Sequence, residues 1–180
     1  MLFRSMSDIP VIETERLRLR PHVRDDFEQC CALWGSPHTV RFIGGQVQDR
    51  QTVWFRLLRY AGSWAMLGYG YWAFEEKATR RFIGEGGLTY ACRGIDALED
   101  VPEPGWVLTP DAGGKGYATE AVQAIMAFAD NVLKAPVTRC IIEPDNLPSL
   151  GVARKCGFSE VTRTQRGETT LIVLERTSAA

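Results

Sequence analysis

Residues 105–133 read GWVLTPDAGGKGYATEAVQAIMAFADNVL, and this stretch decides the fold. Its apolar beginning, residues 105–109, predicts a short strand, and residues 111–116 predict a glycine-rich turn. A long amphipathic helix follows and ends at Lys134-Ala135-Pro136. Its apolar residues share one face, as expected of a helix packed on a sheet: Ala118, Ala121, Val122, Ile125, Phe128, Ala129, Val132 and Leu133.

The glycine-rich turn indicates an anion-binding site. Gly113, Gly114 and Gly116 precede the helix, and glycine lets backbone N–H groups converge on a closely approaching ligand. The first turn of a helix adds unpaired N–H donors and the positive end of the helix macrodipole. Phosphate is the usual ligand of such an arrangement. From the glycines alone, a helix start with a flexible turn is an equal alternative.

Two other phosphate-binding motifs do not fit this turn. A P-loop requires Gly-Lys followed by Ser or Thr, whose hydroxyl reaches magnesium, whereas Gly116 follows Gly114 and Lys115 here. The dinucleotide fingerprint GxGxxG requires a third glycine, and Thr119 stands in its place. A nucleotide-binding domain that used this turn with magnesium would therefore lack the residues it needs.

Residues 114–121, GKGYATEA, resemble the acetyl-CoA motif of the GNAT superfamily of N-acetyltransferases. The family pattern is Gln/Arg-x-x-Gly-x-Gly/Ala. Gly116 and Ala118 match this pattern, and Gly113 stands where Gln or Arg is usual. The departure removes a side chain and keeps the backbone amides, so the turn retains its hydrogen-bond donors.

Further stretches resemble one branch of this family, the ribosomal-protein N-terminal (alanine/serine) acetyltransferases. Residues 14–20, TERLRLR, resemble its opening strand, and residues 40–44, VRFIG, resemble its first inter-helix loop. Residues 143–158 resemble its second coenzyme motif. These matches run in family order from Thr14 to Thr177 and cover nearly the whole chain. The resemblance implies an acetyl-CoA-dependent N-acetyltransferase that uses no metal.

The composition is that of an ordinary globular chain. Of its 180 residues, 45% are hydrophobic and 24% are charged, and the net charge is −1. This charge argues against a general nucleic-acid or membrane-surface binder. No apolar run approaches the ~20 residues of a membrane span, and the beginning, MLFRSMSDIP, is too short and polar for a signal peptide. We expect a single cytoplasmic domain over residues 10–178, preceded by a loose segment over residues 1–9.

The cysteines and histidines indicate neither a disulfide framework nor a metal site. The five cysteines are odd in number, and no CxxC pair occurs: Cys30, Cys31, Cys92, Cys140 and Cys156. This pattern favours reduced thiols in a cytoplasm. His22 and His38 are the only histidines and lie apart in sequence, so we expect no zinc.

The remaining chain predicts a mixed α/β fold. The expected strands span residues 16–20, 71–75, 81–90, 105–109, 137–143, 158–164 and 169–177. The expected helices are residues 26–34, ended by Gly35-Ser36-Pro37, a segment from Asp49 onward, residues 117–133 and residues 147–156. A mixed sheet with helices on both faces follows. The resemblance implies a mostly antiparallel sheet of about seven strands flanked by about four helices.

The expected cofactor site lies between two strands that flank the central helix. The strands at Gly105 and Val137 should be parallel neighbours, and the resemblance implies that they splay apart around the pantetheine arm. It also implies that the pyrophosphate binds backbone N–H groups of the turn and that pantetheine pairs with the preceding strand. Asn146 and Ser149 match the Asn-x-x-Ser of the second motif. The cofactor candidates are Val107, Leu108, Thr109, Gly113, Gly114, Lys115, Gly116, Tyr117, Ala118, Asn146 and Ser149.

Two carboxylates are candidates for the general base. An amine acceptor must lose a proton at neutral pH. Glu103 precedes the central strand and matches the Glu-x-Gly position that often carries a base, or a water-linked base, in relatives. Glu85 lies between glycines on the preceding strand and is the second candidate. The alternative is an exposed loop residue for Glu103 and an outward-facing side chain for Glu85.

The acceptor is expected to be a primary amine, either a protein N-terminus or a small molecule. Trp34, Phe42 and Trp54 are candidates to line its pocket, with core packing as the alternative. No Ser/His/Asp or Cys/His arrangement supports an acyl-enzyme, so we expect direct attack in a ternary complex of a monomer or homodimer. The rival interpretation is a CoA-binding protein with little or no activity, since Gly113 replaces Gln/Arg and Ala153 replaces a tyrosine that serves as the acid in some relatives.

Overall fold

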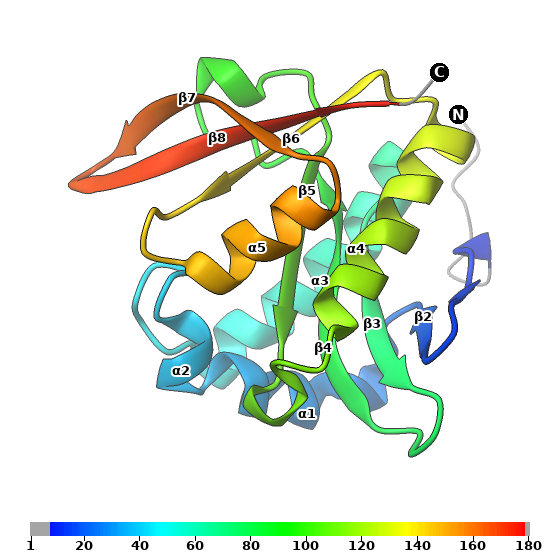
Figure 1. Ribbon diagram of the computed structural model, residues 1–180. Helices are drawn as coiled ribbons and strands as arrows, with labels where there is room; N and C mark the ends of the chain where they lie inside the picture. Colours follow the sequence, from blue (N-terminus) through cyan, green and yellow to red (C-terminus); the bar gives the residue numbers. More distant parts are fainter. Residues whose placement is uncertain (1–7, 179–180) are drawn as a thin grey trace.

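The computed structural model describes residues 8–178 and contains two β-sheets with helices packed around them (Figure 1). The first sheet has the strand order β1-β2-β3-β4-β5, and the second has the order β6-β8-β7. All paired neighbours are antiparallel. The strands of the described residues are Ile12–Glu13 (β1), Leu17–Arg20 (β2), Tyr71–Glu76 (β3), Phe82–Thr89 (β4), Glu103–Leu108 (β5), Val137–Ile142 (β6), Ser159–Arg166 (β7) and Thr169–Thr177 (β8).

Helices cover both faces of the first sheet. On one face, α4 shares an apolar core with Leu19 and Trp72, and on the other, α1 and α3 pack with Ala73 and Val107. No helix within residues 8–178 is long and apolar enough to cross a membrane. The α-helices of the described residues are Phe27–Trp34 (α1), Pro37–Val40 (α2), Arg50–Leu67 (α3), Tyr117–Phe128 (α4) and Leu147–Lys155 (α5).

The expected mixed α/β fold is confirmed, with one more strand than the expected seven because the short β1 pairs with β2. Helix α3 begins at Asp49 as predicted, and the Asp49 side chain caps it by accepting a hydrogen bond from Thr52 N–H at 2.8 Å. The final hairpin turns at Gly167 as expected. The expected loose segment over residues 1–9 lies mostly outside the described residues.

One local prediction was wrong, and one short helix was not predicted. Gly35-Ser36-Pro37 ends α1 as expected, and Pro37 then begins the four-residue helix α2, because proline fits the first helical position, where its missing N–H has no role. Val132 was expected on the buried face and is 60% exposed. Residues Ala129–Leu133 form a π-helical turn, and its wider spacing rotates Val132 away from the sheet.

A β-bulge in β4 turns one acidic side chain toward α1 and α3. The pairing with β3 shifts between Phe74 and Glu75, which leaves Ile83 without a partner. Gly84, which follows, has a φ of 153°. Because the extra residue inverts the alternation of faces, Ile83 joins the core on the α4 side, while Glu85 points toward α1 and α3.

The parallel strands β5 and β6 separate after their beginnings. Arg139 N–H of β6 donates to the carbonyl of Pro102, just before β5, at 3.3 Å. Beyond this contact the two strands belong to different sheets. One edge of β5 therefore faces a gap rather than a paired strand, which confirms the expected splayed pair.

Glycines allow the strands of the first sheet to approach one another closely. A Cβ atom at Gly87 would lie 2.1 Å from the carbonyl oxygen of Gly70. Backbone on both sides of this contact leaves no flexible side chain that could move away. Close backbone approach at Gly87 is thus a condition for the observed pairing of β3 with β4.

We predict that Gly87→Ala destabilises the protein by about 3 kcal/mol, because the new methyl group overpacks against backbone. The matched control is Gly62→Ala in the middle of α3, where a Cβ has nothing within 4 Å. That change should stabilise the protein by up to about 1 kcal/mol through helix propensity. Urea unfolding of both variants measures the difference, and equal stability would contradict the packing described here.

Candidate active site

The turn before α4 presents free backbone donors to solvent. Gly114 and Gly116 have φ values of 75° and 82°, in the left-handed region that glycine adopts without strain. Gly116 is the N-cap residue of α4, and no side chain caps this helix end. The N–H groups of Tyr117, Ala118 and Thr119 therefore lack intrahelical partners. This geometry suits an anion with several oxygens.

A second segment of the chain fixes this turn. The Arg16 guanidinium donates to the carbonyl of Lys115 at 2.9 Å and to Glu120 at 2.7 Å. Glu120 also accepts hydrogen bonds from the Thr14 hydroxyl at 2.6 Å and from Arg16 N–H at 2.7 Å. The sequence did not indicate this role of Arg16, although it lies within the TERLRLR stretch. The turn is thus held against the bend between β1 and β2.

The backbone of β5 presents Leu108 to the gap between β5 and β6. Thr109 N–H donates to the carbonyl of Ile83 in β4 at 2.9 Å. The Val107 carbonyl also lies on the β4 side, against Gly84. Successive strand residues direct their N–H and C=O groups to opposite edges, so those of Leu108 face the gap. Val107, Leu108 and Thr109 were expected to contact pantetheine. Of these three residues, only Leu108 offers backbone groups that do not face β4.

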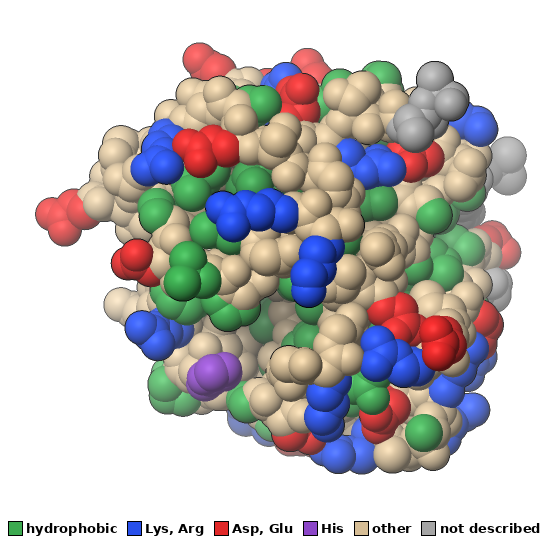
Figure 2. All heavy atoms as spheres, viewed as in Figure 1, with side chains coloured by type: hydrophobic (Ala, Val, Ile, Leu, Met, Phe, Trp, Pro, Cys, Tyr) green, Lys and Arg blue, Asp and Glu red, His purple; other side chains and the backbone are tan. Residues whose placement is uncertain are grey.

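The second expected cofactor motif lies at the beginning of α5. The Asn146 side chain caps this helix by accepting a hydrogen bond from Ser149 N–H at 3.3 Å. Figure 2 shows a hollow on the surface between α5 and the turn that precedes α4, at the place where β5 runs in Figure 1. The two cofactor motifs therefore border the same hollow from opposite sides.

Glu103 is held by an arginine. It begins β5, is 7% exposed, and accepts hydrogen bonds from Arg93 at 2.9 and 3.2 Å, one on each carboxylate oxygen. On the same face of β5, the Tyr71 hydroxyl occupies the space that a Cβ at Gly105 would need. Burial, followed by the nearby carboxylates of Glu103 and Glu85, raises the pKa of Tyr71 to about 12, so this phenol stays protonated at neutral pH.

Glu85 is enclosed completely. Its Oε1 accepts hydrogen bonds from the Trp34 indole at 2.9 Å and from the Tyr60 hydroxyl, and the Cys30 thiol donates to Oε2 at 3.6 Å. Its exposed fraction is 0%. An acceptor amine cannot reach this carboxylate without displacing those side chains. Glu85 therefore orients α1 and α3 on β4, and it has no direct path to the hollow.

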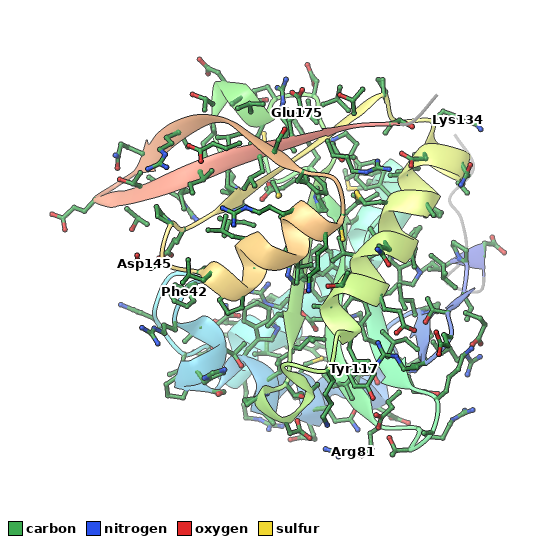
Figure 3. The ribbon with its side chains drawn as sticks, viewed as in Figure 1. Phe42, Arg81, Tyr117, Lys134, Asp145 and Glu175 are labelled. Atoms are coloured by element: carbon green, nitrogen blue, oxygen red, sulfur yellow. The ribbon has the colours of Figure 1, made fainter. Side chains whose placement is uncertain are left out.

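The three aromatic candidates do not gather in one place. Trp34 is buried and holds Glu85, with Arg56 stacked 3.6 Å from its ring. Trp54 packs edge-on against Phe27 and lines a cavity of about 160 Å³ beside α3. Phe42 is half-buried and lies near the beginning of α5 in Figure 3. Of the three, Phe42 alone is placed on the side of the hollow.

Comparison with known proteins agrees with this arrangement. The family model described as acetyltransferase (GNAT) domain matches residues 16–159. The uncharacterized protein YkkB of Bacillus subtilis is 29% identical over 173 residues, which cover 92% of this chain and 94% of YkkB. A putative GnaT-family acetyltransferase from Bordetella pertussis has a TM-score of 0.83 at 27% identity, covering 93% of this chain and 99% of that one.

The fold also matches that of a protein solved with ligands. Spermidine N-acetyltransferase from Vibrio cholerae, in complex with CoA and spermine, has a TM-score of 0.73 at 15% identity. The match covers 92% of this chain and 97% of that chain. At this identity the likeness concerns the fold alone.

We predict that Trp34→Phe destabilises the protein by about 1–3 kcal/mol, because it removes a hydrogen bond to a fully buried carboxylate. Trp106→Phe is the matched control, since Trp106 is half-buried and packs on the opposite core. Chemical denaturation of the two variants measures the difference. A loss no larger for Trp34→Phe than for Trp106→Phe would show that the indole contact with Glu85 contributes little.

Proposed function

Because the chain belongs to the GNAT acetyltransferase family, we propose that it transfers the acetyl group of acetyl-CoA to a primary amine in a ternary complex. The observation that carries the proposal is the uncapped N-terminus of α4 beside the free edge of β5. One feature suits a pyrophosphate and the other suits an extended chain of amides. Acetyl-CoA has both parts, joined in one molecule.

The cofactor contacts follow from these two features. The pyrophosphate accepts hydrogen bonds from the backbone N–H groups between Gly114 and Ala118, favoured by the helix macrodipole. Gly113 in place of Gln/Arg changes a side chain and leaves these donors intact. The pantetheine amides pair with the free N–H and C=O of Leu108. Asn146 and Ser149 face the cofactor from the α5 side of the hollow.

The reaction proceeds by addition and elimination at the thioester. The amine nitrogen attacks the carbonyl carbon, and Leu108 N–H stabilises the negative charge that develops on the carbonyl oxygen. The carbon–sulfur bond then breaks and CoA leaves as a thiolate. The amine proton passes to a base, and the thiolate takes a proton from water, since Ala153 occupies the position where some relatives carry a tyrosine.

Glu103 is the better candidate for the base, acting through a water molecule. It lies on the same strand as Leu108, and its two oxygens are oriented by Arg93. Glu85 is enclosed by Trp34 and Tyr60 and serves as a positioning residue. An amine acceptor, either a peptide N-terminus or a small molecule such as a polyamine, fits this chemistry.

We predict that Gly116→Ala weakens acetyl-CoA binding about tenfold, because alanine in the left-handed region costs about 1–2 kcal/mol and displaces the turn. Gly167→Ala is the matched control, since Gly167 has a φ of 61° at the tip of the final hairpin with open space around its Cα. It carries similar strain far from the turn. Calorimetric titration measures both affinities, and equal weakening would contradict binding at the turn.

We predict that Glu103→Gln lowers kcat/KM by about 10²–10⁴-fold at neutral pH while acetyl-CoA affinity stays unchanged. At higher pH the acceptor amine loses its proton unaided, so the defect should shrink. CoA release with a panel of amines, including peptide N-termini, measures this profile, with the exposed Glu168→Gln as control. A pH-independent defect would assign Glu103 a structural role.

The same panel of amines distinguishes an active enzyme from the rival interpretation, a CoA-binding protein with little or no activity. Turnover of any amine by the wild-type protein supports the enzyme. CoA binding without turnover across the whole panel would favour a binding protein of the same fold. Failure to bind acetyl-CoA would contradict the proposed site itself.

A further inference from the structure

Three buried side chains from different segments meet on the face of the first sheet that α1 and α3 cover. His22 follows β2, Cys30 lies on α1, and Glu85 lies on β4; one ligand-type atom from each falls within 4.8 Å of the others. We propose that His22, Cys30 and Glu85 form a binding site for a divalent transition-metal ion, with zinc as the best match. The site is distinct from the cofactor turn and does not rest on the proposed function.

His22 is buried with both ring nitrogens unsatisfied. The His22 side chain is 5% exposed, and neither ring nitrogen makes a hydrogen bond. Buried polar atoms are rarely left in this state. Nε2 lies 3.7 Å from Oε2 of Glu85, and Nδ1 lies 3.7 Å from a carboxylate oxygen of Asp26. A metal on Nε2 with Nδ1–H toward Asp26 is the usual carboxylate–histidine–metal arrangement.

The two oxygens of the Glu85 carboxylate have different partners. Oε1 already accepts hydrogen bonds from Trp34 and Tyr60. Oε2 instead faces Cys30 Sγ at 3.6 Å and His22 Nε2 at 3.7 Å. One oxygen is therefore fixed by helix donors, and the other is directed at the two further potential ligands.

Within residues 8–178, the Glu85 carboxylate lacks a permanent cation beside it. Arg20 compensates Asp26 through contacts of 2.7 and 2.8 Å. Among the described residues, the only ion-pair partner of Glu85 is His22. No arginine or lysine among the described residues pairs with Glu85, and a buried carboxylate without a paired cation is costly.

A divalent ion corrects this deficit. Its two positive charges balance the Glu85 carboxylate and a Cys30 thiolate, while His22 binds as the neutral imidazole. Cys30 releases its proton to solvent when the metal–sulfur bond forms. Because protons compete with the metal for the cysteine and histidine ligands, metal binding should be weaker at lower pH.

The ligand set and the spacing favour zinc. Zinc accepts nitrogen, sulfur and carboxylate oxygen together, whereas magnesium and calcium favour oxygen alone. Tetrahedral zinc with its usual bond lengths holds ligand atoms roughly 3.3–3.8 Å apart, close to the 3.6 and 3.7 Å measured from Oε2. The cavity of about 160 Å³ borders His22 but neither Cys30 nor Glu85, so it approaches the cluster from the histidine side.

The expected role of the ion is structural. Glu85 pairs with Val107 across β4 and β5, so a metal here would fix the strand that carries Leu108. The sequence pointed away from zinc because His22 and His38 lie far apart. The ligands that complete the proposed set are a cysteine and a glutamate, which carry no metal signature at this spacing.

Zinc content of the full-length protein tests the proposal. We would produce it in zinc-supplemented medium without a histidine tag, and also refold it with zinc sulfate. Plasma mass spectrometry should find about one zinc ion per chain in the wild type. Cys30→Ala should lose most of it, and Cys140→Ala, a buried cysteine in the other core cluster, should retain it.

Cobalt provides a second readout. Cobalt-loaded wild type and Cys140→Ala should show thiolate-to-cobalt charge-transfer absorption that Cys30→Ala lacks. If Cys30→Ala fails to fold, His22→Gln replaces it in the zinc measurement, while the wild-type spectrum still reports a thiolate ligand. Wild-type protein free of zinc after both preparations would overturn the proposal, as would equal zinc content in all variants.

Discussion

The buried carboxylate of Glu85 is the constraint on which the rest of the structure depends. A charge removed from water must be compensated by donors or cations, and here the donors come from α1 and α3. The bulge at Gly84 turns Glu85 toward those helices. Both helices are thereby fixed on β4, and β4 in turn fixes the position of β5.

The unpaired edge of β5 is the second constraint. Its backbone groups are paired with β4 on one side, while beyond the Pro102–Arg139 contact the other side faces a gap. Backbone groups inside a protein need partners, and an extended ligand with amides can supply them. The neighbouring turn, anchored by Arg16 and Glu120, adds donors for an anion at one end of this edge. The fold thus offers one continuous path for a long, phosphate-bearing cofactor.

Much of this could be predicted from the sequence, because the decisive signals are local. The glycine turn and the apolar period of residues 117–133 placed the central helix, and the helix start at Asp49 was also predicted. The separation of β5 from β6 came from family resemblance, since strand pairing is not a local property. The π-helical turn that exposes Val132 left no signal in the apolar pattern.

The site was harder to predict than the fold. Trp34 and Trp54 each follow the apolar spacing of their own helix, and this spacing cannot separate a core residue from a pocket residue. Their contacts, Trp34 with Glu85 and Trp54 with Phe27, are visible only in the folded structure. The pairing of Glu103 with Arg93 joins a loop to a strand and depends on tertiary structure.

We propose that acetyl-CoA binds along β5 and the turn before α4. Amide chemical shifts of nitrogen-15-labelled protein, recorded during titration with acetyl-CoA, test it most directly. The account predicts that the largest changes fall on residues 107–118, with a second group at residues 146–149. Changes confined to other regions, such as the cavity beside α3, would contradict it.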